Sequence, residues 1–491
     1  MIKFNTIPAA IRTPGQHVEF DASQAVSGLA AVNNRVLIIG QKTTNAPALP
    51  LVLRPVSAPA QAVADFGQGS MLARMCQAYM AADRYSEVHA IALADAGGST
   101  AASGSITVTG PATAAGTIAL MIAGHPMSVP VASGATAINI AAAITAIVNS
   151  NADLPVRATQ QAAPNDHVVT IDARNAGTAG NEIDIRHSHY AGENLPAGIA
   201  LAIVAMNGGA TDPDIDGIWP VIGDNEYRTI VVGQFDAATA AKIKAELDDR
   251  WGSARMLESV AYAAKSGSQG ELAAFGDGLN SELITVLGLG ESPSWAPDAA
   301  AIYAAAASYH SAIDPARPLQ TLVLDGLVAP KLNGRFTRAQ RELLLKDGIS
   351  TFTVTGSGTC RIERAITTYQ TDQFGLEDVS FLDLETVTTL AFLRASLRAR
   401  VAQKYPRHKL AADGTRFGAG QAIVTPSVIR AEIVALAREW EEAGLVEGLD
   451  QFIADIRVER DDTDPNRINA LVPPDIVNQF RVFAAAVQFR L

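Results

Sequence analysis

Apolar residues in the central part of the chain follow two kinds of pattern. Short, largely apolar runs, typical of strands buried on both faces of a sheet, occupy 35–40, 87–93, 228–233, 259–264 and 283–287. Apolar residues at helical spacing lie between them and predict helices over 70–82, 237–251, 269–279 and 297–313. This alternation predicts an α/β core, a mainly parallel sheet covered by helices, formed by 25–96 together with 213–342.

The stretch 97–212 interrupts this pattern. Small residues dominate it, and Gly124 lies at the turn of a predicted hairpin over 116–131. The other elements expected here are a helix at 137–148 and strands at 167–173 and 182–186. The pattern indicates a small α+β module inserted into the core, since whole modules are accommodated at exposed loop tips.

The stretch 343–479 is predicted to form a C-terminal α+β domain. Gly356 and Gly358 indicate a hairpin between strands at 351–354 and 360–369. Beyond it we expect helices at 383–404 and 427–443 and strands at 452–459 and 469–472.

Both ends of the chain are predicted to form extended arms, over 1–24 and 480–491. In the first, prolines break regular structure and period-two alternation follows, typical of an edge strand. In the second, apolar side chains alternate onto one face, which suits a strand donated to another sheet. Such arms must lie against their own body or a neighbour. Their large apolar residues are Ile2, Phe4, Val18, Phe20, Phe483, Val487, Phe489 and Leu491.

Composition narrows the kind of partner. Charged residues make up only 18% of the chain, and between Lys42 and Lys242 there is no lysine. A surface of small side chains loses little entropy when an interface covers it, although the composition bias of a GC-rich genome would look the same. The net charge of −12 argues against nucleic-acid binding, which depends on phosphate neutralisation. The local basic stretch with Arg394, Arg398 and Arg400 is better explained by a protein contact or a solvated helix face.

The sequence contains no convincing catalytic motif. The strand residues 36–39 are followed by a single glycine, Gly40, so the phosphate-binding turn of nucleotide enzymes is missing. Ser292 resembles a hydrolase nucleophile, but Pro293 after it cannot donate an oxyanion hydrogen bond. We therefore predict that the chain is not an enzyme and needs no cofactor.

Metal sites and membrane segments are not predicted either. His187 and His189 could share a strand face, yet no further ligands can be named, and the end of a core face explains them better. The acidic segment 462–467 begins like a calcium loop, but Arg467 stands where glycine is needed. Cys76 and Cys360 are expected to be buried thiols. With no signal peptide or membrane-spanning run in view, we expect the chain to stay in the cytosol unless it leaves inside a larger particle.

Three segments together resemble the tail sheath proteins of Mu-like contractile phages and related phage-tail-like particles. The first is the arm 11–21, Ile-Arg-Thr-Pro-Gly-Gln-His-Val-Glu-Phe-Asp. The second is 124–186, which is similar to a module inserted in many sheath proteins and contains Ala-Gly-Asn at 179–181. The third is the order of 452–459, the segment Asp-Pro-Asn-Arg-Ile-Asn at 464–469, and the terminal strand.

The resemblance implies a function. Sheath subunits stack as hexameric rings around a tail tube, donate their arms to the sheets of neighbours, and contract as rigid bodies without nucleotide hydrolysis. It also implies baseplate and terminator partners, an outward-facing inserted module, and a C-terminal domain near the tube. The charges expected near the tube are Arg394, Arg398, Arg400, Glu432, Glu439 and Glu442. Two alternatives remain at this point: another virion structural protein, such as a tube or capsid subunit, and an α/β enzyme with an unrecognised site.

Overall fold

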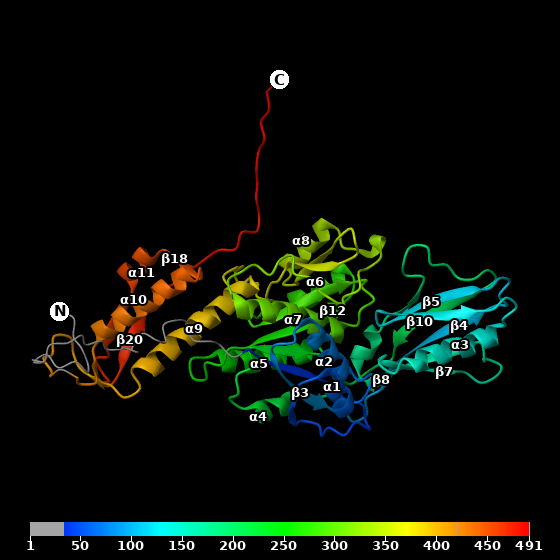
Figure 1. Ribbon diagram of the computed structural model, residues 1–491, viewed down its shortest axis with the longest axis horizontal. Coiled ribbons are helices and arrows are strands. Elements are labelled where there is room, and N and C mark those ends of the chain that lie inside the picture. Colours follow the sequence, from blue (N-terminus) through cyan, green and yellow to red (C-terminus); the bar gives the residue numbers. More distant parts are fainter. Residues whose placement is uncertain (1–33, 419, 491) are drawn as a thin grey trace, which may run out of the picture. The chain divides into compact units, whose positions relative to one another are not determined.

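The computed structural model describes residues 34–418 and 420–490 (Figure 1). Their contacts divide them into two compact units. The core unit comprises 34–391 and 478–490, and the C-terminal unit comprises 392–418 and 420–477. The predictions made for the arm 1–24, with Ile2, Phe4, Val18 and Phe20, and for Leu491, lie outside the described residues.

A six-stranded sheet forms the centre of the core unit. Its strands are β1 (Arg35–Gln41), β2 (Leu53–Val56), β3 (Glu87–Leu93), β11 (Thr229–Val232), β12 (Val260–Ser266) and β13 (Ile284–Gly290). They are ordered β13-β12-β11-β1-β3-β2, and every neighbouring pair is parallel except β2 with β3. The prediction of a mainly parallel sheet is confirmed.

Helices pack against this sheet because their apolar faces need cover. The helices of this part are α1 (Pro59–Phe66), α2 (Met71–Ala82), α4 (Trp219–Ile222), α5 (Ala237–Trp251), α6 (Gln269–Asp277), α7 (Ala296–Ile313) and α8 (Arg338–Lys346). Ser70 starts α2, since its hydroxyl accepts a hydrogen bond from the backbone N–H of Ala73. Helices α2 and α7 pack on each other and on the sheet.

The close approach of α2 to the sheet depends on glycine. A side chain at Gly233 would lie within 3 Å of the sulfur atoms of Met71 and Met75. A Cβ atom at Gly40 would lie 3.1 Å from the sulfur atom of Met75. Gly40, near the end of β1, therefore serves helix packing.

The inserted module contains two antiparallel sheets and one helix. One sheet has the order β10-β4-β8-β7, and the other has the order β6-β5-β9. The elements are β4 (Ala101–Thr109), β5 (Gly116–Ile122), β6 (His125–Val131), α3 (Ala137–Ser150), β7 (Val156–Gln160), β8 (Val168–Ala176), β9 (Ile185–His187) and β10 (Ala200–Asn207). Helix α3 packs on strands of both sheets and buries Ile140, Ile144 and Val148.

The core unit also contains the predicted hairpin after 343. Strands β14 (Thr351–Val354) and β15 (Cys360–Arg364) pair antiparallel, and the start of α9 (Leu384–Lys404) follows them. By contacts, residues 343–391 thus group with the core, whereas the sequence pattern placed a domain boundary at 343. Contact units and domains need not coincide, so the sequence-based domain limits stay predictions.

The C-terminal unit is built around the remainder of α9 and α10 (Pro426–Glu442), with three small two-stranded sheets. Its other elements are α11 (Leu449–Asp455), β16 (Lys409–Leu410), β17 (Ile423–Val424), β18 (Val446–Glu447), β19 (Arg457–Arg460), β20 (Ile468–Leu471) and β21 (Asp475–Ile476). The strand predicted over 452–459 is wrong in its first half, because Phe452 lies in α11 and only Arg457 onward is strand.

Candidate functional site

The C-terminal arm is the most exposed apolar segment of the core unit. Residues 480–490 have no assigned strand or helix, and Figure 1 shows them as an extended segment running to the C-terminus. The side chains of Phe483, Val487 and Phe489 are 80%, 87% and 80% exposed. Folded monomers seldom leave several large apolar side chains this open, and such surfaces mark interaction sites. The strand expected at 480–491 is not formed among residues 480–490, because a strand requires a partner for its backbone.

Arg481 holds the beginning of this arm. Its Nη2 lies 2.9 Å from Oε1 of Glu385 and 3.1 Å from Oδ1 of Asp383. The Glu385 side chain is fully buried, and this burial raises the pKa of its carboxyl, which the charge of Arg481 opposes. We name Arg481, Asp383 and Glu385 the arm anchor.

Three of the charges expected near a tube neutralise one another inside the C-terminal unit. Arg400 on α9 donates to Glu432 over 3.0 Å and also pairs with Glu439, both on α10. Lys404 donates to Glu432 over 2.7 Å. These ion pairs fasten α9 to α10. The other predicted tube-facing residues are the half-buried Arg394 and the exposed Arg398 and Glu442.

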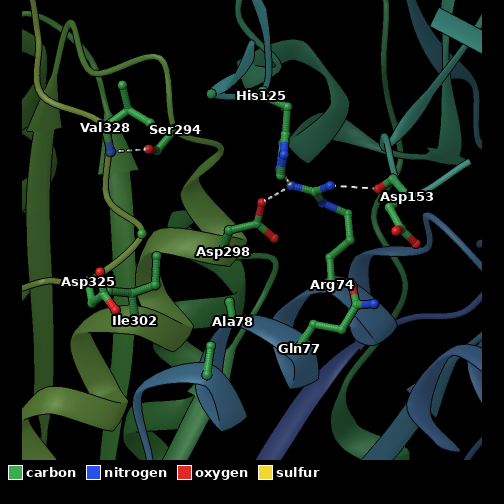
Figure 2. Close-up of a pocket in the computed structure, with 14 residues that line it drawn as sticks. Arg74, Gln77, Ala78, His125, Asp153, Ser294, Asp298, Ile302, Asp325 and Val328 are labelled. Carbon is green, nitrogen blue, oxygen red and sulfur yellow. Dashed lines mark hydrogen bonds and ion pairs between the residues drawn. The ribbon is translucent and has the colours of Figure 1, made fainter. Parts of the chain in front are cut away.

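A cavity of about 310 Å³ lies where α2, α7 and the β5–β6 turn of the module meet (Figure 2). Arg74 donates to the backbone oxygen of Asp153 over 2.6 Å and forms an ion pair with Asp298. Its Nη2 is 2.9 Å from Nε2 of His125, whose pKa is lowered by burial and by the Arg74 charge. Arginine can only donate, so His125 is neutral and accepts. This cluster joins module to core.

Further polar bonds tie the module to the core. The Asn175 amide donates to the backbone oxygen of Lys42 over 2.8 Å and accepts from the Met71 N–H over 3.0 Å. The Trp295 indole donates to the backbone oxygen of Ala179 over 2.8 Å. Sequence reasoning missed these contacts, because the partners lie more than 100 positions apart in the chain. They make the module an integral part of the core unit.

The rejected catalytic and metal motifs have structural roles. Ser292 donates to the backbone oxygen of Val328 over 2.6 Å. His189 is 9% exposed, and its Nε2 lies 3.1 Å from the backbone oxygen of Ala329, whereas His187 lies beside Ser188. Among residues 34–418 and 420–490, no group of three or more His, Cys, Asp or Glu side chains could hold a metal ion.

The segment that begins like a calcium loop is a closed turn between β19 and β20. The Asp461 carboxylate accepts hydrogen bonds from Thr463, from the Asp464 N–H and from Asn469. These bonds hold its pKa well below the usual range. The interpretation as an acidic turn between two strands is confirmed.

No helix in the described part of the chain is long and apolar enough to cross a membrane.

Comparison with known proteins identifies the class. The phage tail sheath protein central domain matches residues 208–368, and the phage tail sheath C-terminal domain matches residues 377–490. Similar folds include the sheath tail protein Lin1278 from Listeria innocua, at TM-score 0.50 and 13% identity, covering 93% of this chain and 95% of that one. The sheath complex of an extracellular contractile injection system in its contracted state has TM-score 0.50 and 9% identity, covering 98% of each chain.

The chain belongs to the phage tail sheath protein family. Within it, the chain is 40% identical over 490 residues to the Mu-like prophage FluMu tail sheath protein of Haemophilus influenzae, covering 100% of both chains. It is therefore a contractile tail sheath subunit, a structural component of a phage or phage-like tail. The resemblance seen in the sequence is confirmed, and both alternatives, a different virion protein and an enzyme, are wrong.

Proposed function

We propose that this subunit polymerises into stacked hexameric rings around a tail tube and contracts to drive the tube through the host envelope. Each subunit donates its terminal arms to the sheets of its neighbours. The observation that carries the proposal is the C-terminal arm, with Phe483, Val487 and Phe489 open to solvent. A head-to-tail contact of this kind does not close on itself and so generates a helical filament.

The arm contains enough apolar surface to hold subunits together. Phe483, Ala485, Val487 and Phe489 alternate along the chain and would share one face of a donated strand. Burying each of the three large side chains contributes about 1.5–3 kcal/mol, before ordering and association costs are subtracted. With main-chain hydrogen bonds added, a donated arm supports a mesh that survives a change of lattice.

The small sheets of the C-terminal unit are suitable acceptors. Among the described residues, β19 and β20 pair only with each other, so each strand has a free edge. Their four paired positions make the longest of the unit's three two-stranded ladders. A strand from a neighbour would extend this sheet by β-augmentation.

Contraction then consists of rigid-body movement with the arms as hinges. The polar bonds of Asn175, Arg74 and Trp295 support movement of the module together with the core. Energy is stored when tube and baseplate template an extended lattice, and it is released as the contracted packing takes over. Nucleotide hydrolysis has no part in this cycle.

The partners of the proposed assembly are other copies of the chain, a tube protein, and baseplate and terminator proteins. The C-terminal unit faces the tube, with Arg398 and Glu442 as the exposed charges of the predicted set. Arg400, Glu432 and Glu439 act within the unit by holding α9 to α10. Assembly takes place in the host cytoplasm before the particle leaves the cell.

Removal of residues 482–491 tests the proposal while leaving the arm anchor intact. We expect a folded subunit with unchanged circular dichroism that no longer forms tubes in negative-stain electron microscopy. A matched pair of triple variants tests whether assembly needs the apolar side chains of the arm or only its length. Phe483→Ser, Val487→Ser and Phe489→Ser should abolish tubes, whereas Ala484→Ser, Ala486→Ser and Gln488→Ser, on the opposite face, should not. Tubes formed by the truncated chain would overturn arm donation.

A further inference from the structure

Within residues 34–490, the chain passes between the two units twice. It leaves the core unit within α9, between Ala391 and Phe392, and returns at Asn478. The arm is therefore the continuation of a segment that has already rejoined the core. Force applied to the arm can enter the molecule in two ways, through the arm anchor or backward along the chain into the C-terminal unit.

The arm anchor is built into the interior of the core unit. Besides Arg481, Oε1 of Glu385 accepts the backbone N–H of Leu319 over 2.7 Å. Asp383 is held by both Nε and Nη2 of Arg364 on β15, each at 2.9 Å. These bonds connect the start of α9 to the loop before Gln320 and to the β14–β15 hairpin. The hairpin lies against β13 of the central sheet, where Leu287 and Ser350 form a bridge.

Exposure changes abruptly along the arm. The Arg481 side chain is 14% exposed, whereas Val482 and Phe483 beside it are each 80% exposed. A buried carboxylate that loses a paired cation is strongly destabilising, so the pairing of Glu385 with Arg481 resists separation. The arm thus has a fixed root and an open remainder. The ten residues beyond the root, 482–491, span at most about 36 Å when extended, so they reach only a directly adjacent subunit.

The backward route is weak by comparison. The last strand before the arm, β21 (Asp475–Ile476), pairs with β18 (Val446–Glu447) through only two residue pairs. One further hydrogen bond, from the Val477 N–H to the Leu445 oxygen, follows at 3.1 Å. A pull along this segment would peel a two-residue ladder from its end.

We propose that Arg481 is a positioning residue that transmits tension from an engaged C-terminal arm directly to the core sheet. The route runs through Asp383, Glu385 and the β14–β15 hairpin, and it bypasses residues 392–477. The C-terminal unit is then spared the load that the subunit's own engaged arm applies during contraction. The inference rests on the proposed donation of the arm, and it adds a specific residue and a route for the force.

The test is single-molecule pulling on the full-length monomer. One handle is fused after Leu491, and the other is attached at Tyr85→Cys, an exposed position on the core unit, while Cys76 and Cys360 are buried. In the wild type we expect a first force-resisting event at the arm anchor before the C-terminal unit extends. Arg481→Met should eliminate that event and let β21 separate at lower force. The matched control Arg490→Met removes a positive charge from the exposed end of the same arm and should leave the event unchanged.

Two more variants distinguish the ionic role of Arg481 from a packing role and from poor folding of the single variant. Arg481→Lys keeps the charge and should restore the event in part, which a general packing role would not do. Arg481→Met combined with Glu385→Gln leaves no unpaired buried carboxylate, so it remains informative if the single variant folds poorly. Identical force–extension traces for wild type and the double variant would overturn the proposal. Because the readout uses monomers, it is independent of the polymerisation test, in which arm donation itself can fail.

Discussion

The guanidinium of Arg74 and the carboxylate of Asp298 form an ion pair that joins α2 to α7 inside the core unit (Figure 2). Both residues are buried, at 5% and 8% exposure. Arg74 also donates to the backbone oxygen of Asp153, so one side chain links two core helices to the inserted module. A buried pair of this kind is most sensitive to the loss of one partner, because the other charge is left without compensation.

Arg74→Met is therefore expected to destabilise the core unit by about 3–5 kcal/mol, since Asp298 would remain buried and unpaired. Urea unfolding followed by circular dichroism measures the change. Arg84→Met, at an exposed position just after the same helix, is the matched control and should change stability by less than about 0.5 kcal/mol. Equal midpoints for the two variants would contradict a bonding role for Arg74.

The central sheet could be predicted because its signal is local. The runs at 35–40 and 87–93 are short and largely apolar, and they became β1 and β3 with nearly the predicted bounds. Helix α5 (Ala237–Trp251) was predicted with its observed limits. In the structure the Asp236 side chain caps it by accepting the Thr239 N–H. Long elements with one strong period are the ones that sequence patterns define best.

Other elements were missed although their pattern is present. Strand β4 (Ala101–Thr109) alternates buried and exposed positions throughout, but Ala102 and Gly104 carry too little apolar surface to make the period visible. In α11, Leu449, Phe452 and Ile453 have helical spacing, which was overlooked in favour of a strand. The contacts at the roots of arm and module could not be predicted, because they join residues far apart in the chain.

Asn175→Ala should loosen the inserted module. The change removes the acceptor of the Met71 N–H and the donor to the Lys42 oxygen, and leaves both buried groups unsatisfied. Each unsatisfied group costs about 1–3 kcal/mol. We expect faster amide exchange at the start of α2 and along β8. Asn194→Ala, at an exposed residue that bonds only locally to Gly192, should leave this exchange unchanged.

The pairing of Glu432 makes the C-terminal unit sensitive to acid. Burial alone would raise the pKa of Glu432, but hydrogen bonds and charge from Lys404 and Arg400 lower it below the ordinary value of 4.5. A carboxyl with a lowered folded-state pKa contributes stability that is present above pH 4.5 and is lost as pH falls through the folded pKa.

Glu432→Gln should therefore be less stable than wild type at pH 7 and show a flatter loss of stability below pH 4.5. Amide exchange across α10, corrected for the intrinsic effect of pH, measures the stability at neutral pH and its loss in acid. Glu442→Gln, which removes an exposed carboxylate from the end of the same helix, should keep the wild-type profile. A wild-type profile in Glu432→Gln would show that the ion pairs contribute nothing.

The indole of Trp440 on α10 donates to the hydroxyl of Ser396 on α9 over 2.9 Å, and both residues are buried. Ser396→Ala leaves the buried indole N–H unpaired, and Trp440→Phe leaves the Ser396 hydroxyl only its bond to the Leu393 oxygen. Each variant should therefore destabilise the C-terminal unit, by about 1–3 kcal/mol for Ser396→Ala and by about 1 kcal/mol or more for Trp440→Phe. The double variant should cost less than the sum of the two, with a coupling energy of about 1 kcal/mol. Amide-exchange protection of α10, measured in the wild type, the two single variants and the double variant, gives this coupling energy. Additive losses would mean that the hydrogen bond does not stabilise this helix pair, and that the ion pairs of Arg400 hold α9 to α10 without it.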